Sequence, residues 1–423
     1  MVRKAMIAAL MMLTAQGVAA ASAAQQRAFR AATFGDVGPL VAALPNLHDR
    51  PAAALARIEI AAARMDQAGV RRALAAYVAT RDHDPTRSAR AWALAAQTSF
   101  AMGDYAEAAR SASRWHAALG ARGAASDLSD ADQSQMMAGL LALAPPMQVV
   151  AAAGMEVPTQ RDMAGLLRAS VQIAGVEQSA VLDTGANLST ISASAAARLH
   201  LRMIDGAATV GSATRRAVPV RIGIADEMRF AGFIFRDVPF LVLDDAQLRF
   251  PLGNGYSIEA IIGFPIFRAM GSVTFDQKRF TPGQSVDAGR SSPISMQGND
   301  LLVSLQLGRT AVPLLLDTGG NATSLSREFA QDHPDLLASL PQSDQHVGGA
   351  GGISAQRIAV WSNVPVRIGG SSVTLDHIAI ETSSPGDTDR KTYGTIGQDL
   401  LSQFLAYTID FRTMRFGVIP KSR

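Results

Sequence analysis

The hydrophobic pattern divides the chain into two regions of different character. From about residue 36 to residue 145, apolar residues, mostly alanine, recur at helical spacing between short polar breaks such as residues 81–85. After Pro145-Pro146 the chain consists of short runs rich in Val, Ile, Leu and Phe, interrupted by Gly, Pro and Asp, which is typical of β-strands. The pattern therefore predicts a helical domain over residues 25–146, followed by an all-β region.

One segment of the helical region resembles a tetratricopeptide repeat. Trp92, Gly103, Tyr105 and Ala108 fall where that helix–turn–helix pattern has Trp, Gly, an aromatic and a small residue. The stretch 58–80 is a degenerate candidate for a second repeat. Because a repeat array needs about three units to be stable, an unspecialised helical bundle is the alternative. The resemblance implies that this domain binds a protein partner, either a substrate or a regulator.

The N-terminus has the features of an export signal. Arg3 and Lys4 precede the apolar stretch 5–18, and residues 21–23 are small enough for a cleavage site. We therefore expect a signal peptide over residues 1–24 and a periplasmic or secreted protein. The apolar stretch is shorter than the roughly 20 residues that a spanning helix needs, so no stable membrane insertion is expected after cleavage. An uncleaved membrane anchor is the alternative.

The β region contains two copies of one sequence pattern. The segments Leu167–Ser192 and Leu301–Ser326 each hold an apolar run followed by Asp-Thr-Gly, and Asp317 follows Asp183 by 134 residues. Further along each copy an Ile-Gly pair recurs at the same spacing, before a helix-like segment and a strand. A stretch rich in Gly, Ser and Pro separates the copies. We therefore predict two similar lobes, residues 164–281 and residues 298–420, joined by a linker at residues 282–297.

The repeated Asp-Thr-Gly, with an apolar strand before it and the apolar-Ile-Gly segment after it, resembles the aspartic peptidases. The resemblance is to a retropepsin-like unit of the bacterial exported type, present twice in tandem, and it covers about residues 164–420. It implies a bilobal, all-β acid-protease domain in which Asp183 and Asp317 meet at one cleft. For a single Asp-Thr-Gly, an ordinary strand-to-loop turn is the alternative, because Asp and Gly are common in turns. The expected fold class is thus multidomain, all-α followed by all-β.

The same resemblance assigns roles to the residues beside the two aspartates. Gly185 and Gly319 let each loop turn tightly, while Thr184 and Thr318 hydrogen-bond across the twofold axis and hold the loops in register. Two carboxylates this close share one proton. The ionised carboxylate takes a proton from water, which attacks the peptide carbonyl, and its protonated partner donates to the developing oxyanion. The implied activity is endopeptidase cleavage of exported polypeptides, without a metal or another cofactor.

A glycine-containing hairpin in each half is a candidate flap that closes over the substrate. The flap residues are Gly211 in the first half and Gly348 and Gly349 in the second, and neither hairpin has the tyrosine that pepsin-like flaps use. The halves also differ after the Ile-Gly pair, where the first has Phe264 and the second Gln398.

Composition and charge exclude several other classes of function. The net charge is only +3 and no long basic run occurs, so nucleic acid is not an expected partner. The seven histidines form no metal-binding motif, and no nucleotide-binding fingerprint is complete. Two alternatives to the peptidase stay open. One is a catalytically inactive peptide-binding module with a helical interaction domain, and the other makes the helical array the functional part and the β region its scaffold.

Overall fold

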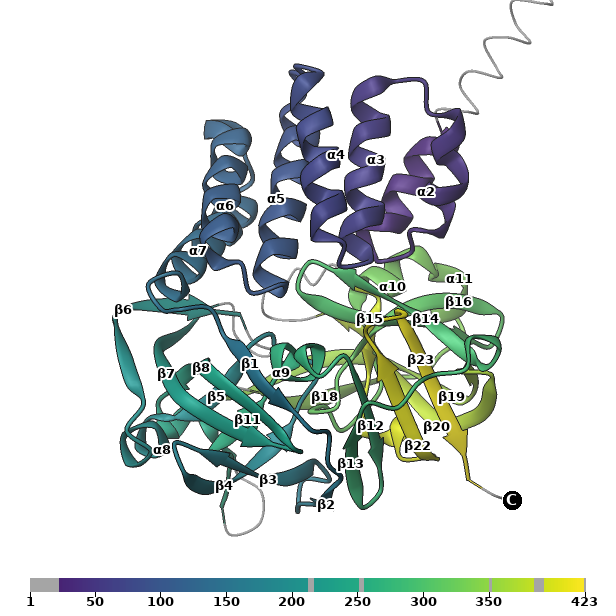
Figure 1. The fold of residues 1–423 in the computed structure, drawn as a ribbon. Coiled ribbons are helices and arrows are strands. Elements are labelled where there is room, and N and C mark those ends of the chain that lie inside the picture. Colours follow the sequence, from purple (N-terminus) through teal and green to yellow (C-terminus); the bar gives the residue numbers. More distant parts are fainter. Residues whose placement is uncertain (1–22, 212–216, 251–254, 350–351, 384–391, 422–423) are drawn as a thin grey trace, which may run out of the picture.

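The chain forms an N-terminal helical domain that sits on a larger β domain in this computed structural model (Figure 1). The structure describes residues 23–211, 217–250, 255–349, 352–383 and 392–421. The predicted fold class, a helical domain followed by a bilobal β domain, is confirmed. Nearly all of the predicted signal peptide, residues 1–24, lies outside the described residues. Of the helices that are described, none has the length and apolar character needed to cross a membrane.

Four helices of the first domain begin directly after an aspartate that caps them. Asp49, Asp66, Asp84 and Asp104 each accept a hydrogen bond from a backbone N–H in the first turn of the helix that follows, which satisfies donors that a helix leaves unpaired. Residues 23–33 are helical. The remaining helices of the domain are α2 (Gly38–Ala43), η1 (Leu44–Asn46), α3 (Arg50–Ala63), α4 (Gln67–Ala79), α5 (Pro85–Ala101), α6 (Tyr105–Leu119), η2 (Gly120–Arg122) and α7 (Ala125–Leu141).

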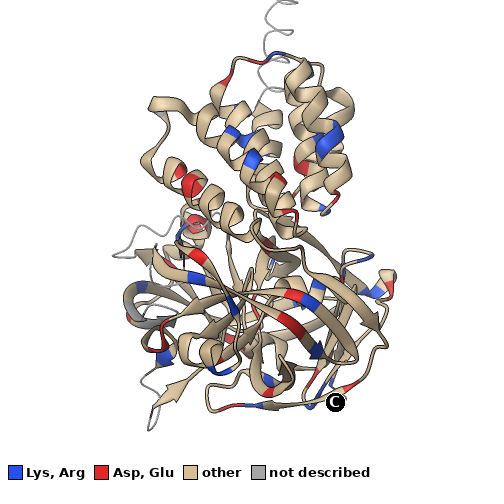
Figure 2. Ribbon diagram, turned by 60° about the vertical axis from the view of Figure 1, so that its left-hand side comes forward, with Lys and Arg blue, Asp and Glu red and all other residues tan. Residues whose placement is uncertain are grey.

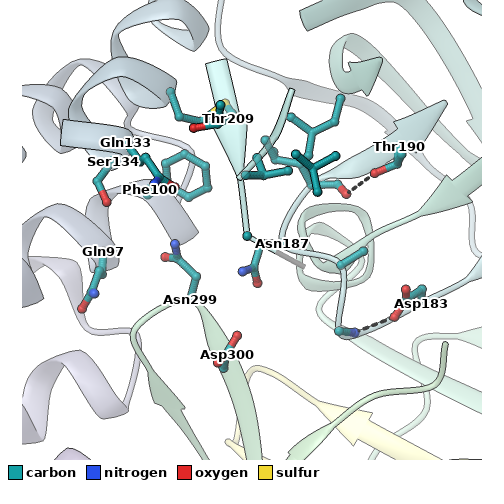
Figure 3. A pocket seen from close by; sticks show the side chains of 18 of the residues that line it. Gln97, Phe100, Gln133, Ser134, Asp183, Asn187, Thr190, Thr209, Asn299 and Asp300 are labelled. Carbon is teal, nitrogen blue, oxygen red and sulfur yellow. Dashed lines mark hydrogen bonds between the residues drawn. The ribbon is translucent and has the colours of Figure 1, made fainter. Parts of the chain in front are cut away.

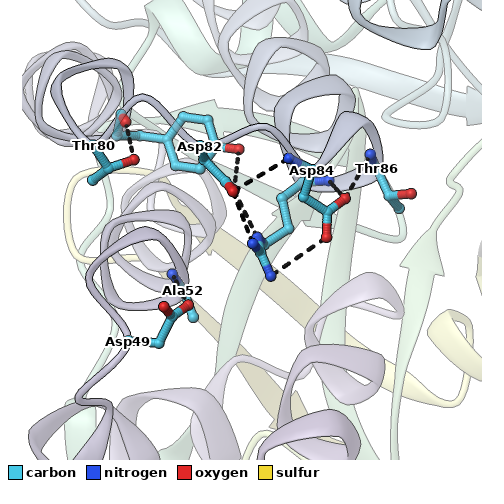
Figure 4. Close-up of polar contacts among 8 residues, drawn as sticks. Asp49, Ala52, Thr80, Asp82, Asp84 and Thr86 are labelled. Carbon is cyan, nitrogen blue, oxygen red and sulfur yellow. Dashed lines mark hydrogen bonds and ion pairs between the residues drawn. The ribbon is translucent and has the colours of Figure 1, made fainter.

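The polar break between α4 and α5 is a tightly bonded turn (Figure 4). The Asp82 carboxylate accepts two hydrogen bonds from the Arg87 guanidinium, at 2.7 and 2.8 Å, and a third from the Tyr77 hydroxyl at 2.9 Å. Arg87 therefore holds the pKa of Asp82 well below its usual range. Asp84 caps α5 through the backbone N–H of Thr86. These contacts give the break a structural role in joining two antiparallel helices.

The helices corresponding to the predicted tetratricopeptide repeat are α5 and α6. They are connected at Gly103, whose φ of +80° suits glycine in a tight turn. Tyr105 and Ala108 are buried on α6, and Trp92 packs partly buried between two small cores of the domain. Assignment of this domain to the tetratricopeptide class stays a prediction.

The β domain consists of two lobes of similar connectivity and a sheet that joins them (Figure 1). Lobe 1 contains β1 (Gln148–Ala152), β2 (Val157–Arg161), β3 (Leu167–Ile173), β4 (Val176–Leu182), β5 (Ser189–Ser192), α8 (Ala193–Arg198), β6 (Arg202–Val210), β7 (Val218–Phe230), β8 (Phe233–Leu243), η3 (Asp245–Leu248), β9 (Arg249–Phe250), β10 (Tyr256–Ser257), β11 (Ala260–Ile262), α9 (Phe264–Ala269), β12 (Ser272–Asp276) and β13 (Arg279–Pro282). Lobe 2 contains η4 (Ala288–Arg290), β14 (Ser291–Gln297), β15 (Asp300–Leu307), β16 (Thr310–Leu316), β17 (Ser324–Leu325), α10 (Arg327–Asp332), α11 (Pro334–Leu337), β18 (Gln342–Gly349), β19 (Gly352–Ile368), β20 (Ser371–Ser383), β21 (Gly394–Ile396), α12 (Gln398–Leu401), β22 (Phe404–Asp410) and β23 (Arg415–Pro420).

The joining sheet has the strand order β2-β13-β12-β22-β23-β14, with antiparallel pairs throughout. At its centre Thr274 of β12 pairs with Thr408 of β22, and their hydroxyl oxygens are 2.8 Å apart. Residues 282–297, which the sequence predicts as a linker, include β14. That strand pairs with both β15 and β23, since an extended segment next to an unpaired edge gains backbone hydrogen bonds.

The helical domain contacts both lobes. Towards lobe 2, Arg30 forms an ion pair with Asp332 at 2.6 Å, and the Phe34 ring stacks on the Tyr393 ring. Towards lobe 1, the buried guanidinium of Arg268 on α9 donates to the backbone oxygen of residue 102, at the end of α5. In addition, α7 packs against the β6–β7 hairpin. The helical domain therefore lies across the junction of the lobes.

Candidate active site

Two strand ends place the predicted catalytic aspartates. β4 pairs in parallel with β11, and β16 pairs in parallel with β21. Each pair continues by one hydrogen bond into the loop: the Asp183 N–H donates to Ile262 at 3.0 Å, and the Asp317 N–H donates to Ile396 at 3.1 Å. The apolar-Ile-Gly segment noted in the sequence is thus the strand beside each Asp-Thr-Gly loop.

Reciprocal hydrogen bonds join the two loops. The Thr184 N–H donates to Thr318 Oγ1 at 2.9 Å, and the Thr318 N–H donates to Thr184 Oγ1 at 3.2 Å. Each hydroxyl in turn donates to a carbonyl of the opposite lobe, Thr184 to Leu316 at 2.6 Å and Thr318 to Leu182 at 2.7 Å. Both threonines are buried, so none of these groups has water as a substitute partner. The relative position of the loops is therefore fixed by four buried hydrogen bonds.

The glycines of the two loops lie against the opposite carboxyl groups. A Cβ atom on Gly319 would lie 2.4 Å from Cγ of Asp183, and one on Gly185 would lie 2.9 Å from Cγ of Asp317. No real Cβ contact is this short, so only glycine lets the carboxyls approach each other. Each glycine also donates its N–H to the aspartate of its own loop, at 2.8 and 2.9 Å.

The paired carboxyls have the electrostatics of a proton-sharing site. Burial and the neighbouring charge of Asp317 raise the pKa of Asp183 well above its usual range, and a hydrogen bond between the two carboxyls raises it further. The hydrogen bond from the Gly185 N–H lowers the pKa of Asp183, but by less than burial and the charge of Asp317 raise it. The pair therefore holds a proton at pH values where a solvated aspartate has lost its own.

The cavity above the aspartates has walls from three parts of the chain (Figure 3). Its volume is about 560 Å³, and both Asp183 and Asp317 line it. Lobe 1 contributes mainly apolar side chains from β5 to β8, and lobe 2 contributes Asn299 and Asp300 from the β14–β15 turn. Helix α5 adds Gln97 and Phe100, and α7 adds further residues, so the helical domain forms part of the cavity wall.

The predicted flap residues lie on two long hairpins, β6–β7 and β18–β19. Gly211 follows β6 directly and lines the same cavity as the aspartates. Gly348 and Gly349 end β18, where they pair with Ile353 and Gly352 of β19. The tips of the hairpins, residues 212–216 and 350–351, lie outside the described residues.

Support for the loops from below was not anticipated from the sequence. Ser189 Oγ accepts a hydrogen bond from the Gly263 N–H, and Thr323 Oγ1 accepts the equivalent bond from the Gly397 N–H, both at 3.1 Å. The 134-residue repeat contained the signal, because it aligns Ser189 with Thr323. No sequence signal marked Gln97, whose position depends on how the two domains pack.

Among the described residues, neither domain has a surface dominated by one sign of charge. Lys and Arg are interspersed with Asp and Glu over both domains (Figure 2). Within the described part of the chain, no group of three His, Asp or Glu side chains is placed to hold a metal ion.

Comparisons with known proteins bear on the first lobe. Residues 169–266 match the family model described as aspartyl protease, which supports a protease of the aspartyl type. Among solved structures, the chain resembles conglutin gamma, a basic 7S globulin from lupine seeds, with 12% identity over 64% of this chain and 95% of that one. The TM-score of that likeness is 0.36, which supports no conclusion about fold or activity. No curated protein matches the chain.

Proposed function

We propose that this protein is an aspartic endopeptidase with one catalytic site, shared by Asp183 and Asp317. The observation that carries the proposal is the set of reciprocal threonine hydrogen bonds that holds the two Asp-Thr-Gly loops together at one cavity. The raised pKa of Asp183 supports it further, because the reaction needs one protonated and one ionised carboxyl side by side.

The chemistry assigns complementary roles to the two aspartates. The ionised carboxylate accepts a proton from a water molecule as the water attacks the peptide carbonyl carbon. The protonated carboxyl donates to the carbonyl oxygen as it becomes an oxyanion. When the tetrahedral intermediate breaks down, the carboxyl that took the water proton gives it to the nitrogen of the leaving amine. A hydroxyl of the intermediate returns its proton to the other carboxylate as the carbonyl re-forms, so the pair again shares one proton. No covalent bond forms between enzyme and substrate.

We propose that the lobes are tandem retropepsin-like units, which the 134-residue spacing supports. The substrates are polypeptides of the periplasm or of the secreted fraction, because the N-terminus has the composition of an export signal. The helical domain is of tetratricopeptide type, and the α5–α6 turn at Gly103 supports this assignment.

The proposal is tested with Asp183→Asn and Asp317→Asn. Purified mature protein and both variants are incubated with denatured casein from acidic to neutral pH, and new amino termini are counted. We expect the parent to cleave and each variant to lose at least about a thousandfold in rate, since one neutral amide cannot replace the shared proton. Cleavage that survives in both variants excludes the two-aspartate mechanism. Peptide binding by a parent that cleaves at no pH identifies an inactive peptide-binding module instead.

A further inference from the structure

The cavity that holds the aspartates continues beneath the helical domain. A second cavity of about 710 Å³ lies between helices α5 to α7 and the β14–β15 turn. The two cavities share wall residues from all three parts of the chain, among them Gln97 of α5, Ser134 of α7, Asn187 of lobe 1 and Asn299 of lobe 2. The two cavities therefore adjoin at this wall, and the second extends towards Trp115 on α6; together they are called the passage.

The part of the passage common to both cavities is lined by several amide side chains, together with the carboxyl groups of Asp130 and Asp300. In Figure 3, Gln97, Asn299 and Asn187 follow one another in the direction of Asp183. Gln133 and Ser134 of α7 also belong to this wall, and the Gln133 amide donates to Ser129. A side-chain amide has the same donor and acceptor groups as a peptide bond, so such a wall suits the main chain of an extended polypeptide.

Two of these amides have unused hydrogen-bonding capacity. Gln97 Oε1 and Asn299 Oδ1 are both buried and accept no hydrogen bond from the part of the chain that the structure describes. Buried polar atoms are nearly always paired in folded proteins, because an unpaired one loses its water without compensation. A half-turn of either amide about its last side-chain bond exchanges oxygen and nitrogen, so the acceptor can be presented to the passage.

The position of Gln97 is set by close packing between the domains. Gly298, with a φ of +62°, lies directly beneath the Gln97 amide, and a Cβ atom there would lie 3.5 Å from Nε2. The amide therefore lies over the β14–β15 turn, at the boundary between the helical domain and lobe 2. Its place in the passage depends on both domains at once.

We infer that the helical domain forms a substrate subsite, in which Gln97 and Asn299 accept hydrogen bonds from main-chain N–H groups of an extended polypeptide that continues beyond the catalytic aspartates. The inference rests on the proposed peptidase function and adds to it a preference for long, unfolded substrates. Continuity with the catalytic floor favours the substrate chain over a separate partner as the occupant.

The test compares substrates of two lengths. Peptides of about four and about ten residues are centred on one bond that the parent cleaves in denatured casein, and the longer one extends roughly 33 Å, enough to enter the passage. Gln97→Met and Asn299→Leu remove the acceptors at similar volume. We expect kcat/KM for the long peptide to fall about five- to tenfold in each variant, and to fall clearly less for the short one. Equal losses for both lengths indicate a structural role and overturn the inference.

A blocking variant gives an independent readout. Ser134→Trp places a large side chain in the passage, whereas Gln135→Trp adds the same side chain on the exposed side of α7. We expect Ser134→Trp alone to abolish the advantage of the long peptide. An advantage that persists in Ser134→Trp excludes the passage as the route of the substrate.

A binding experiment separates failure of the inference from failure of the proposed function. Fluorescein-labelled denatured casein is titrated with the Asp183→Asn form, with and without Gln97→Met, and anisotropy is measured. Weaker binding with Gln97→Met supports the subsite even if the parent proves inactive. Unchanged binding, together with normal cleavage by the parent, overturns the subsite and leaves the peptidase proposal standing.

Discussion

The two lobes are nearly identical at the aspartates and different around them. The threonine bonds, the glycine contacts and the Ser189 and Thr323 supports all recur 134 residues apart. Outside this centre the symmetry ends: the β6–β7 hairpin of lobe 1 packs on α7, and Gln398 of lobe 2 replaces Phe264 of lobe 1. In the peptidase that we propose, the two carboxyls need equal halves to hold them, whereas the surrounding cavity is built from unequal ones.

The lobes differ in the contacts made by the β6–β7 hairpin and by Gln398. Leu140 of α7 lies where a Cβ atom on Gly206 would be, at 2.6 Å, so β6 is held against the helical domain. In lobe 2, Gln398 Nε2 donates to Thr318 at 2.7 Å, while its oxygen accepts from Arg161 at 2.9 Å. Phe264 is a buried core residue, and its hydrocarbon side chain cannot form such a polar link. At this one position, lobe 1 supports its loop by packing and lobe 2 by polar bonds.

Alanine at the two loop glycines is expected to have the largest effect. A methyl group at position 319 would approach Asp183 more closely than one at position 185 would approach Asp317, at 2.4 against 2.9 Å. Both substitutions force the carboxyls apart, and misplacement by about 1 Å costs roughly a hundredfold in rate. We expect Gly319→Ala to lose at least that much in kcat, and Gly185→Ala somewhat less.

Gly139→Ala on α7 is the matched control, because a Cβ atom there meets nothing within 4 Å among the described residues. Cleavage rates of Gly319→Ala, Gly185→Ala and Gly139→Ala are measured on one peptide and compared with that of the parent. Retention of full activity by Gly319→Ala would show that the carboxyls do not need this separation.

Removal of the hydroxyl at Thr184 or Thr318 tests whether the central symmetry extends to stability. Thr318→Val deletes an acceptor for the Thr184 N–H and a donor to Leu182, and leaves both buried partners unpaired. We expect the free energy of unfolding to fall by about 2–3 kcal/mol in each Val variant, measured by urea denaturation. Thr→Ser keeps the hydroxyl and should lose much less. If the free energy of unfolding falls by different amounts at positions 184 and 318, the two lobes do not contribute equally to stability at the centre of the site.

Asp399 makes a stabilising contact that has no counterpart in lobe 1. It accepts hydrogen bonds from the Thr323 N–H at 2.8 Å and the Thr323 hydroxyl at 2.7 Å, whereas lobe 1 has Pro265 at the equivalent position. We expect Asp399→Ala to lower the free energy of unfolding by about 1–2 kcal/mol, and Pro265→Ala by less than about 1 kcal/mol. Urea denaturation measures the loss in each variant. Equal losses would mean that Asp399 stabilises lobe 2 no more than Pro265 stabilises lobe 1.

Local patterns account for what the sequence predicts correctly. The period of the apolar residues separates helices from strands, and the two Asp-Thr-Gly loops are visible because each occupies the same place in a repeat. The alternation of residues does not reveal that 282–297 contains β14, since the first part of that strand pairs with β23, far along the chain, and only its last part pairs with β15.

The part of the cavity wall that the helical domain provides could not be predicted from the sequence. Gln97 is one of many polar residues on an amphipathic helix, and its role follows from the docking of α5 on the β14–β15 turn. Docking depends on long-range contacts such as Arg30 with Asp332 and Phe34 with Tyr393. Such contacts leave no periodicity in the sequence, so an active-site wall contributed by another domain is seen only in the fold.

The smallest predicted effect concerns pH and stability. Because the pKa of Asp183 is raised in the folded state, the native protein binds more protons than the unfolded chain between the ordinary aspartate pKa and the raised one. Stability contributed by the shared proton is therefore complete in acid and is lost as the pH rises through the raised pKa. An asparagine amide cannot ionise, so Asp183→Asn should melt roughly 2–4 °C above the parent at neutral pH, with the gap closing towards acid. Thermal melts at several pH values measure the gap. A constant gap would mean that the carboxyls do not share a proton, and a gap in Asp317→Asn that differs from that in Asp183→Asn would extend the asymmetry of the lobes to the catalytic pair itself.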